Sequence, residues 1–191
     1  METYLPLASL HITMGQADNR RNMPLKMVIE PQPGDIEDYR RCLSLSDAAE
    51  TVSWIRDGIR YRREYFVSYP DRTAYVYCTA EPKEGEGRDK VLDFAFGVDS
   101  SLHYINGAED GEAFLTGIAP DHAEPSYTAV APRFIYKDPE NSDALRFACC
   151  ARVISTDGTV ASDGARVYVN GASYALLAVC AGTSYAGFRV P

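Results

Sequence analysis

Residues 54–61 read Trp-Ile-Arg-Asp-Gly-Ile-Arg-Tyr, and this stretch decides the fold class. Asp57 and Gly58 have the chemistry of a two-residue β-hairpin loop, because both central positions of a type I′ turn require positive φ. The residues on either side alternate between apolar and polar side chains, which indicates strands buried on one face. The stretch therefore predicts two antiparallel strands, Glu50–Arg56 and Ile59–Tyr69, joined by a tight turn.

The same alternation, with many β-branched and aromatic residues between turn residues, continues on both sides of this hairpin. It predicts further strands at Tyr4–Met14, Leu25–Glu30, Tyr39–Leu45, Ala74–Ala80, Val91–Val98, Glu112–Thr116, Ala144–Ser155, Arg166–Val169 and Ser173–Ala181. Helical periodicity is almost absent. We therefore expect an all-β fold, an antiparallel two-sheet β-sandwich of the supersandwich type with about eleven or more short strands. A length of 191 residues fits one such domain, spanning positions 1–191.

Asx-Gly pairs predict where this sandwich turns. The pairs Asp157-Gly158, Asp163-Gly164 and Asn170-Gly171 divide the C-terminal third, so the chain from Arg146 onward is expected to form an antiparallel meander. Another pair, Asn106-Gly107, predicts a turn that would hold His103 nearby.

The charge balance limits the partners. Lys and Arg total 19 against 27 Asp and Glu, a net charge of −8. A negative surface repels nucleic acid and anionic membranes, so neither is an expected partner. No apolar stretch approaches the ~20 residues of a membrane span, and the first residues lack the basic and apolar regions of a signal peptide.

Five cysteines are present, at positions 42, 78, 149, 150 and 180. The odd number and the strand-like surroundings of most of them predict reduced thiols that pack as small hydrophobic side chains, with no disulfide framework. The spacing also lacks a Cys-x-x-Cys pair with matching histidines, so a metal site is not predicted. Reduced thiols favour a reducing compartment, and a cytoplasmic location is the expectation.

Signatures of catalysis are missing from the sequence. It contains no nucleophile elbow, phosphate-binding loop, zinc-protease helix or dinucleotide-binding glycine motif. Glu109, Asp110 and Glu112 predict a solvated turn rather than the pair of facing carboxyl groups that glycoside hydrolysis needs. We therefore assign no catalytic residue, no metal ligand and no cofactor to this chain. His11, within an apolar run, is interpreted as a strand residue.

The segment Ile118–Ser142 is too long for a simple connection and contains four prolines. Its candidate residues for binding a substrate or a neighbouring domain are His122, Tyr127, Phe134 and Tyr136. His122 lies beside acidic residues, so it could contact a metal or a sugar hydroxyl, or could form hydrogen bonds that shape the loop. The three aromatic residues form the only loop cluster resembling a sugar-binding platform.

The order of several motifs resembles the N-terminal domain of family 95 glycoside hydrolases, the inverting α-L-fucosidases and their relatives. The resemblance lies in the stretches Tyr4–Leu7, Leu10–Ile12, Asp38–Arg41, Leu43–Ala49, Ile59–Asp71, Leu115–Tyr127, Leu145–Ala148, Gly158–Gly164 and Ser173–Ser184. It covers nearly the whole chain in collinear order. Residues 6–10 read Pro-Leu-Ala-Ser-Leu, where the family has a glycine.

This resemblance implies a fragment of a larger multidomain hydrolase. In the family, the general acid and base lie in an (α/α)6 helical barrel, and no family catalytic residue corresponds to a position here. The expected function is a non-catalytic N-terminal domain that packs against this barrel and supports it. The barrel of the same parent chain is then the expected partner. The alternative is a stand-alone β-sandwich that binds carbohydrate, such as fucosylated oligosaccharides, or another protein.

Overall fold

The computed structural model describes residues 6–14, 36–82, 89–125, 127, 131–138 and 141–187. Over these residues the chain forms fourteen strands and no helix, so the all-β prediction is confirmed. Among them there is accordingly no helix of the length and apolarity needed to cross a membrane. The predicted strand Leu25–Glu30 lies outside the described residues.

The strands follow one another with short connections except between β1 and β2 and around β9 and β10. They are β1 (Ser9–Met14), β2 (Glu37–Ser44), β3 (Ala49–Arg56), β4 (Ile59–Ser68), β5 (Thr73–Pro82), β6 (Leu92–Asp99), β7 (His103–Glu109), β8 (Glu112–Ile118), β9 (His122–Ala123), β10 (Phe134–Ile135), β11 (Arg146–Thr156), β12 (Thr159–Ser162), β13 (Val167–Ala172) and β14 (Tyr174–Thr183).

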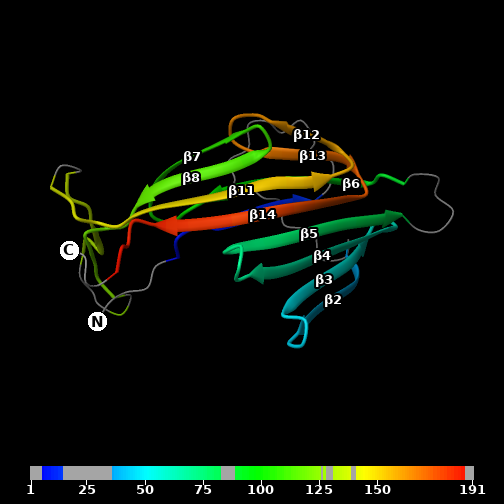
Figure 1. The fold of residues 1–191 in the computed structure, drawn as a ribbon, viewed down its shortest axis with the longest axis horizontal. Coiled ribbons are helices and arrows are strands. Elements are labelled where there is room, and N and C mark those ends of the chain that lie inside the picture. The colour runs from blue at the N-terminus through cyan, green and yellow to red at the C-terminus, as the bar shows by residue number, and fades with distance from the viewer. Residues whose placement is uncertain are drawn as a thin grey trace.

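Two sheets form the predicted sandwich. The larger has eight strands in the order β2-β3-β4-β5-β14-β11-β8-β7, and the smaller has four in the order β1-β6-β13-β12. All pairings between these strands are antiparallel. In Figure 1 the eight-stranded sheet faces the viewer, with β1 and β6 behind it. A third, two-stranded sheet pairs β10 with β9.

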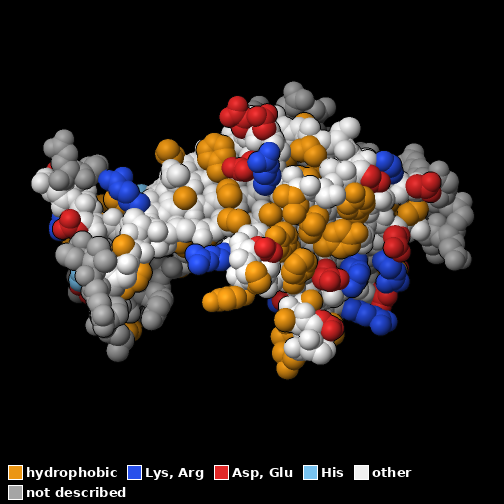
Figure 2. Space-filling view, in the orientation of Figure 1, with side chains coloured by type: hydrophobic (Ala, Val, Ile, Leu, Met, Phe, Trp, Pro, Cys, Tyr) orange, Lys and Arg blue, Asp and Glu red, His pale blue; other side chains and the backbone are white. Residues whose placement is uncertain are grey.

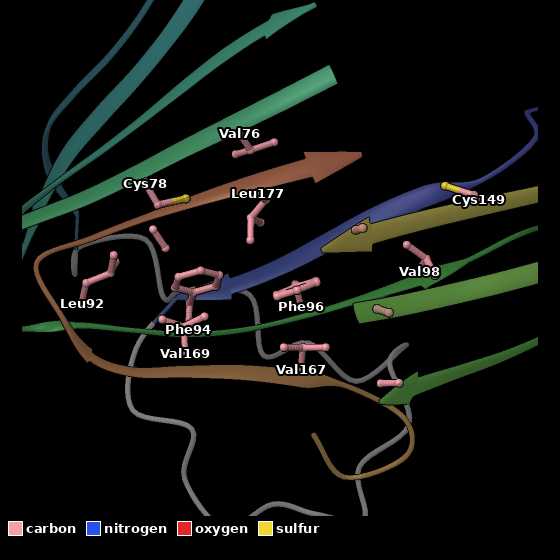
Figure 3. Close-up of a cluster of buried hydrophobic side chains, with 14 of the residues drawn as sticks. Val76, Cys78, Leu92, Phe94, Phe96, Val98, Cys149, Val167, Val169 and Leu177 are labelled. Atoms are coloured by element: carbon pink, nitrogen blue, oxygen red, sulfur yellow. The ribbon is translucent and has the colours of Figure 1, made fainter. Parts of the chain in front are cut away.

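The core lies between the two sheets and is centred on β6. Phe94 and Phe96 are 0% and 1% exposed, and Figure 3 shows them among side chains from both sheets, including Leu177 of β14 and Val167 of β13. Strand β6 pairs with β1 on one side and with β13 on the other. The large buried side chains of β6 therefore join the small sheet to the middle of the large one.

The Asp57-Gly58 turn is confirmed. Both residues have positive φ, 53° and 76°, and they connect β3 to β4 in the register Arg56 opposite Ile59. This is the backbone that a two-residue hairpin requires, and it places Trp54 opposite Tyr61, with the two rings stacked at 5.4 Å.

The turn predicted at Asn106-Gly107 is wrong, because both residues lie inside β7. Gly107 allows the ring of Phe114 on β8 to pack closely against the backbone of β7, because a Cβ atom at this position would lie 2.9 Å from that ring. The turn between these two strands is instead made by Asp110 and Gly111, whose φ values are 48° and 77°. Asn106 uses its side chain to donate a hydrogen bond to the carbonyl of Val98.

The meander predicted after Arg146 is also wrong. β11 and β14 pair within the large sheet, whereas β12 and β13 form a hairpin in the small sheet, so the chain crosses between sheets twice. Asn170 and Gly171 form no hairpin turn but lie in β13 at a break in its register with β6. The isolated Asx-Gly signal does not distinguish a bulge from a turn, since both use a positive φ, here 61° at Gly171.

Asp157 holds the two crossings together. Its carboxylate accepts hydrogen bonds from the backbone N–H and the hydroxyl of Ser173, at 2.8 and 2.9 Å, and lies 3.3 Å from Lys90 Nζ. These donors, led by the Ser173 N–H, hold the pKa of Asp157 well below its usual value. The first crossing, from β11 to β12, is thereby attached to the second, from β13 to β14.

The prediction that the cysteines are free is confirmed for all five. Cys78 and Cys149 are buried in the core, where burial raises the pKa of Cys78 to about 12. These two thiols pack as hydrophobic side chains, as their positions in apolar strands predicted.

We expect Leu177→Ala to destabilise the domain by about 2 to 5 kcal/mol, because this fully buried side chain fills the space between the sheets. Val67→Ala is the control, since Val67 is 75% exposed and its truncation should change stability by less than about 0.5 kcal/mol. Urea unfolding of both variants measures the difference. Equal losses would show that the core is not centred where the buried side chains indicate.

Candidate functional site

The long segment after β8 folds into a small hairpin at one end of the molecule. β9 and β10 pair with His122 opposite Ile135 and Ala123 opposite Phe134. Figure 1 shows the segment at the left, beyond the ends of β8, β11 and β14. The hairpin is closed further by the Glu124 N–H, which donates to the carbonyl of Arg133 at 2.8 Å.

Asp121 attaches this hairpin to the chain that leads into β11. Its carboxylate accepts the backbone N–H of Lys137 at 2.8 Å and the hydroxyl of Ser142 at 3.0 and 3.1 Å. The side chain is 5% exposed, and Lys137 Nζ lies 3.7 Å away. These donors, the Lys137 backbone N–H first, lower the pKa of Asp121, so the carboxylate stays charged and continues to accept them at neutral pH.

Tyr136 attaches the segment to the large sheet. Its ring stacks on the ring of His103, the first residue of β7, with centroids 3.6 Å apart and planes 9° from parallel. Tyr136 is half-buried, in contrast to the exposed strand β10 immediately before it. Of the predicted site residues, this one therefore helps to hold the loop against its own domain.

The other candidates point outward. His122 is exposed and its Nε2 lies 2.9 Å from Glu124 Oε1, so one of its two open interpretations, a loop-shaping hydrogen bond, is present. Phe134 is 38% exposed and Tyr127 is 75% exposed. Because His122 and Phe134 belong to neighbouring pairs of the hairpin, their side chains lie on opposite faces. The hairpin therefore does not place His122 and Phe134 on one face.

A shallow open hollow of about 720 Å³ lies where β7, β8, β11 and β14 end beside this hairpin. Its lining is mostly apolar or small and comprises His103, Tyr104, Ile105, Thr116, Gly117, Ile118, Arg146, Phe147, Ala148, Gly182, Thr183 and Ser184. The sequence analysis missed it, because its residues come from four separate strands. The one signal of this hollow in the sequence is the small size of two residues, Ala148 and Gly182, which lie opposite one another on β11 and β14.

The outward face of the large sheet carries a strip of aromatic side chains, which the sequence analysis also missed. Phe66 stacks on Tyr75 at 5.0 Å, and Tyr77 meets Tyr174 at 6.2 Å. Figure 2 shows hydrophobic side chains gathered over β5 and β14. The four rings belong to β4, β5 and β14, so a platform exists on the sheet rather than in the loop.

The remaining candidate groups have structural partners. His11 lies in β1, as interpreted from the sequence, and its Nε2 is 3.0 Å from Asp99 Oδ1. Glu112 begins β8 opposite Arg152, 4.0 Å from its guanidinium, and Asp110 forms the turn before it. In the parts of the chain that the structure describes, no three His, Cys, Asp or Glu side chains converge as a metal site would require.

Residues 1–187 match the family described as "Glycosyl hydrolase family 65, N-terminal domain". The chain therefore belongs to this family of glycoside hydrolase N-terminal domains. No curated protein matches it. One similar solved structure is a "Putative kojibiose phosphorylase from human microbiome", with 11% sequence identity, a TM-score of 0.47, and coverage of 78% of this chain and 20% of that chain. The present chain thus spans about a fifth of that protein.

The matched family carries the number 65, whereas the motifs in the sequence resemble family 95. The match to family 65 and the resemblance to family 95 both identify the chain as an N-terminal domain of the glycoside hydrolase kind. The match does not support the finer assignment to the α-L-fucosidases.

We expect Asp121→Asn to detach the hairpin, because an amide replaces one of the two oxygens that accept from Lys137 and Ser142. Hydrogen exchange measures this as a lost protection factor at the Lys137 amide. The pKa of Asp121 is lower in the folded protein than in the unfolded chain, where it is about 4. The stabilisation from this contact is therefore complete above the unfolded pKa and is lost as the pH falls through the folded pKa.

Asp110→Asn is the matched control, since Asp110 lies in an exposed turn whose positive φ an asparagine tolerates. It should leave the Lys137 amide protected. Retained protection in Asp121→Asn would show that the carboxylate does not hold the segment.

Proposed function

From its family membership, we propose that this chain is the non-catalytic N-terminal domain of a larger carbohydrate-active enzyme and that it packs against a helical catalytic barrel of the same parent chain. The observation that carries the proposal is the match over residues 1–187 to a hydrolase N-terminal domain family. The fold is consistent with it, because the acidic residues considered as candidates lie in turns and ion pairs rather than facing one another across a cleft.

The hairpin end of the domain is the surface proposed to meet the barrel. Asp121 and Tyr136 fix the segment on the inside, while Phe134, Ile135 and Tyr127 are 38%, 44% and 75% exposed. The hollow beside it adds further apolar surface. A hairpin that is held within its own domain and exposes apolar side chains is suited to a permanent interdomain contact, because little conformational entropy remains to be lost when a partner covers it.

For the parent activity we propose hydrolysis of an α-L-fucoside or a closely related sugar. The support is the collinear resemblance to family 95 in the sequence, including the stretch Leu115–Tyr127 that leads into the hairpin. In this proposal the catalytic carboxyl groups belong to the barrel. Turnover of a chromogenic α-L-fucoside by the parent enzyme, and none by this domain alone, is the expected result. Turnover by the purified domain that one carboxylate substitution abolishes would overturn the non-catalytic assignment.

A second candidate function is carbohydrate binding by the sheet face. The specific observation is the strip formed by Phe66, Tyr75, Tyr77 and Tyr174, whose half-buried rings lie on one face. Aromatic rings beside polar groups are a common way to bind sugar rings, and Tyr174 Oη lies 3.2 Å from the Ser155 hydroxyl. The strip contains no deep cleft, so this candidate ranks second.

The double variant His122→Ala/Tyr127→Ala tests the junction. We expect the unfolding midpoint of the isolated domain to stay nearly unchanged, and the stability or activity of the two-domain protein to fall, since interdomain contacts act only when the partner is present. Thermal unfolding of both forms and the parent's turnover are the measurements.

The control is Tyr39→Ala/Leu45→Ala, which removes side chains that are 59% and 86% exposed at the opposite end of the large sheet. It should leave both forms unchanged. A loss of about 1 to 3 kcal/mol in the isolated His122→Ala/Tyr127→Ala domain would instead mean that the hairpin only covers its own sheet edge.

Calorimetric titration of the isolated domain with fucosylated oligosaccharides tests the second candidate. We expect no saturable binding, because the strip offers no enclosure for a sugar. Saturable heat that disappears in Tyr77→Ala/Tyr174→Ala and persists in Tyr39→Ala would make carbohydrate binding the function of this face.

A further inference from the structure

Two cysteines face one another across the middle of the large sheet. In the register of β11 and β14, Cys150 lies directly opposite Cys180. Side chains alternate along a strand, and the preceding Cys149 is buried among the core residues in Figure 3. Cys150 therefore points to the outer face, where it is partly exposed and Cys180 is exposed.

The backbone geometry brings their Cα atoms within range of a disulfide. Arg146 and Ser184 lie opposite one another, and the Ser184 N–H donates to the Arg146 carbonyl, so they form a hydrogen-bonded pair. Hydrogen-bonded pairs alternate with non-hydrogen-bonded pairs along two antiparallel strands. Cys150 and Cys180, four residues further along β11 and β14, are therefore also a hydrogen-bonded pair. In such pairs the Cα atoms are about 5.5 Å apart, close to the commonest separation for disulfides. The Cβ atoms lie somewhat further apart than a relaxed disulfide prefers, so the bond would be strained and easily reduced.

The surroundings leave one thiol free to react first. The hydroxyl of Thr73 donates to the carbonyl of Asp71 at 2.9 Å, so at its 3.2 Å contact with Cys180 Sγ it can accept a hydrogen bond from the thiol. Cys180 is the more exposed of the two, whereas burial, with a smaller effect of Glu112, raises the pKa of Cys150. Cys180 is thus the thiol that meets an oxidant, and Cys150 is positioned to attack second.

We propose that Cys150 and Cys180 form a reversible dithiol site that is oxidised to a cross-strand disulfide by a low-molecular-weight disulfide such as glutathione disulfide. The Cys180 thiolate attacks one sulfur of glutathione disulfide, whose S–S bond breaks, and one glutathione leaves as a thiolate that takes up the proton released by Cys180. The Cys150 thiolate then attacks Sγ of Cys180 and displaces the second glutathione. Two protein thiols are oxidised and one disulfide is reduced to two thiols.

The bond would join β11 and β14, two adjacent interior strands of the large sheet. It would close a loop from Cys150 to Cys180 that contains β12 and β13, the hairpin belonging to the small sheet. It would thereby tie both crossings between the sheets to one position. Neither pairing in the sheet nor the core needs to be broken, since both side chains lie on the outer face.

Cys42 gives a matched comparison within the same chain. It is exposed on β2, and its partner across the strands is Thr51 rather than a cysteine. The reaction of Cys42 with glutathione disulfide should end at the mixed disulfide with glutathione, because no second thiol lies opposite Cys42 to displace the glutathione. The site at Cys150 and Cys180 should instead retain no glutathione.

The experiment is mass spectrometry of the reduced full chain after incubation with excess glutathione disulfide and acid quenching. We expect one glutathione on Cys42, the loss of two hydrogens from a peptide pair joining Cys150 to Cys180, and full reversal by dithiothreitol. Cys42→Ser should lose the glutathione and keep the disulfide. Cys150→Ser should retain glutathione on Cys180, because the attacking thiol has been removed.

The proposal is overturned if the unchanged chain retains glutathione on Cys180, if neither Cys150 nor Cys180 is modified while Cys42 is, or if Cys180 joins another cysteine. The result for the unchanged chain decides the question even if a serine variant fails to fold.

Discussion

The structure depends on the burial of β6 between two sheets of unequal size. Phe94, Phe96 and Val98 are almost completely buried, and they bring the small sheet onto the middle of the large one. Small residues occupy the other face of the same strand, where Ala95 is also buried. Each of the large side chains contributes roughly 1.5 to 3 kcal/mol on burial, so this strand decides which part of the large sheet is covered.

The difference in size between the sheets explains the exposed features. A four-stranded sheet attached through β6 covers part of one face of an eight-stranded sheet, and no strand among the described residues covers the opposite face. That face carries the aromatic strip and the paired thiols of Cys150 and Cys180, which alternate with the buried Cys149 and Leu177 along the same strands. The same period-two pattern therefore supplies both the core and the surface available to partners.

The fold class could be predicted from the sequence because it depends on local signals. The alternation of apolar residues and the Asp57-Gly58 turn are fixed by neighbouring residues, and both are found in the structure. What could not be predicted depends on residues distant in sequence. The Asx-Gly pairs predicted turns at Gly107 and Gly171, but Gly107 packs against Phe114 and Gly171 lies at a register break between β13 and β6. The hollow is likewise assembled from four strands, so no single stretch contains its signal.

The long segment shows the same limit in the site. Its aromatic residues suggested one cluster, but two of them have different surroundings, because Tyr136 stacks on His103 of β7 while Phe134 lies on the exposed hairpin. Asp121 and Tyr136 attach the β9–β10 hairpin to the domain, so part of the entropy of ordering this hairpin is already lost before any partner arrives. A partner that covers the exposed apolar side chains of the hairpin would then gain most of the free energy of burying apolar surface, which favours a lasting contact over folding on binding.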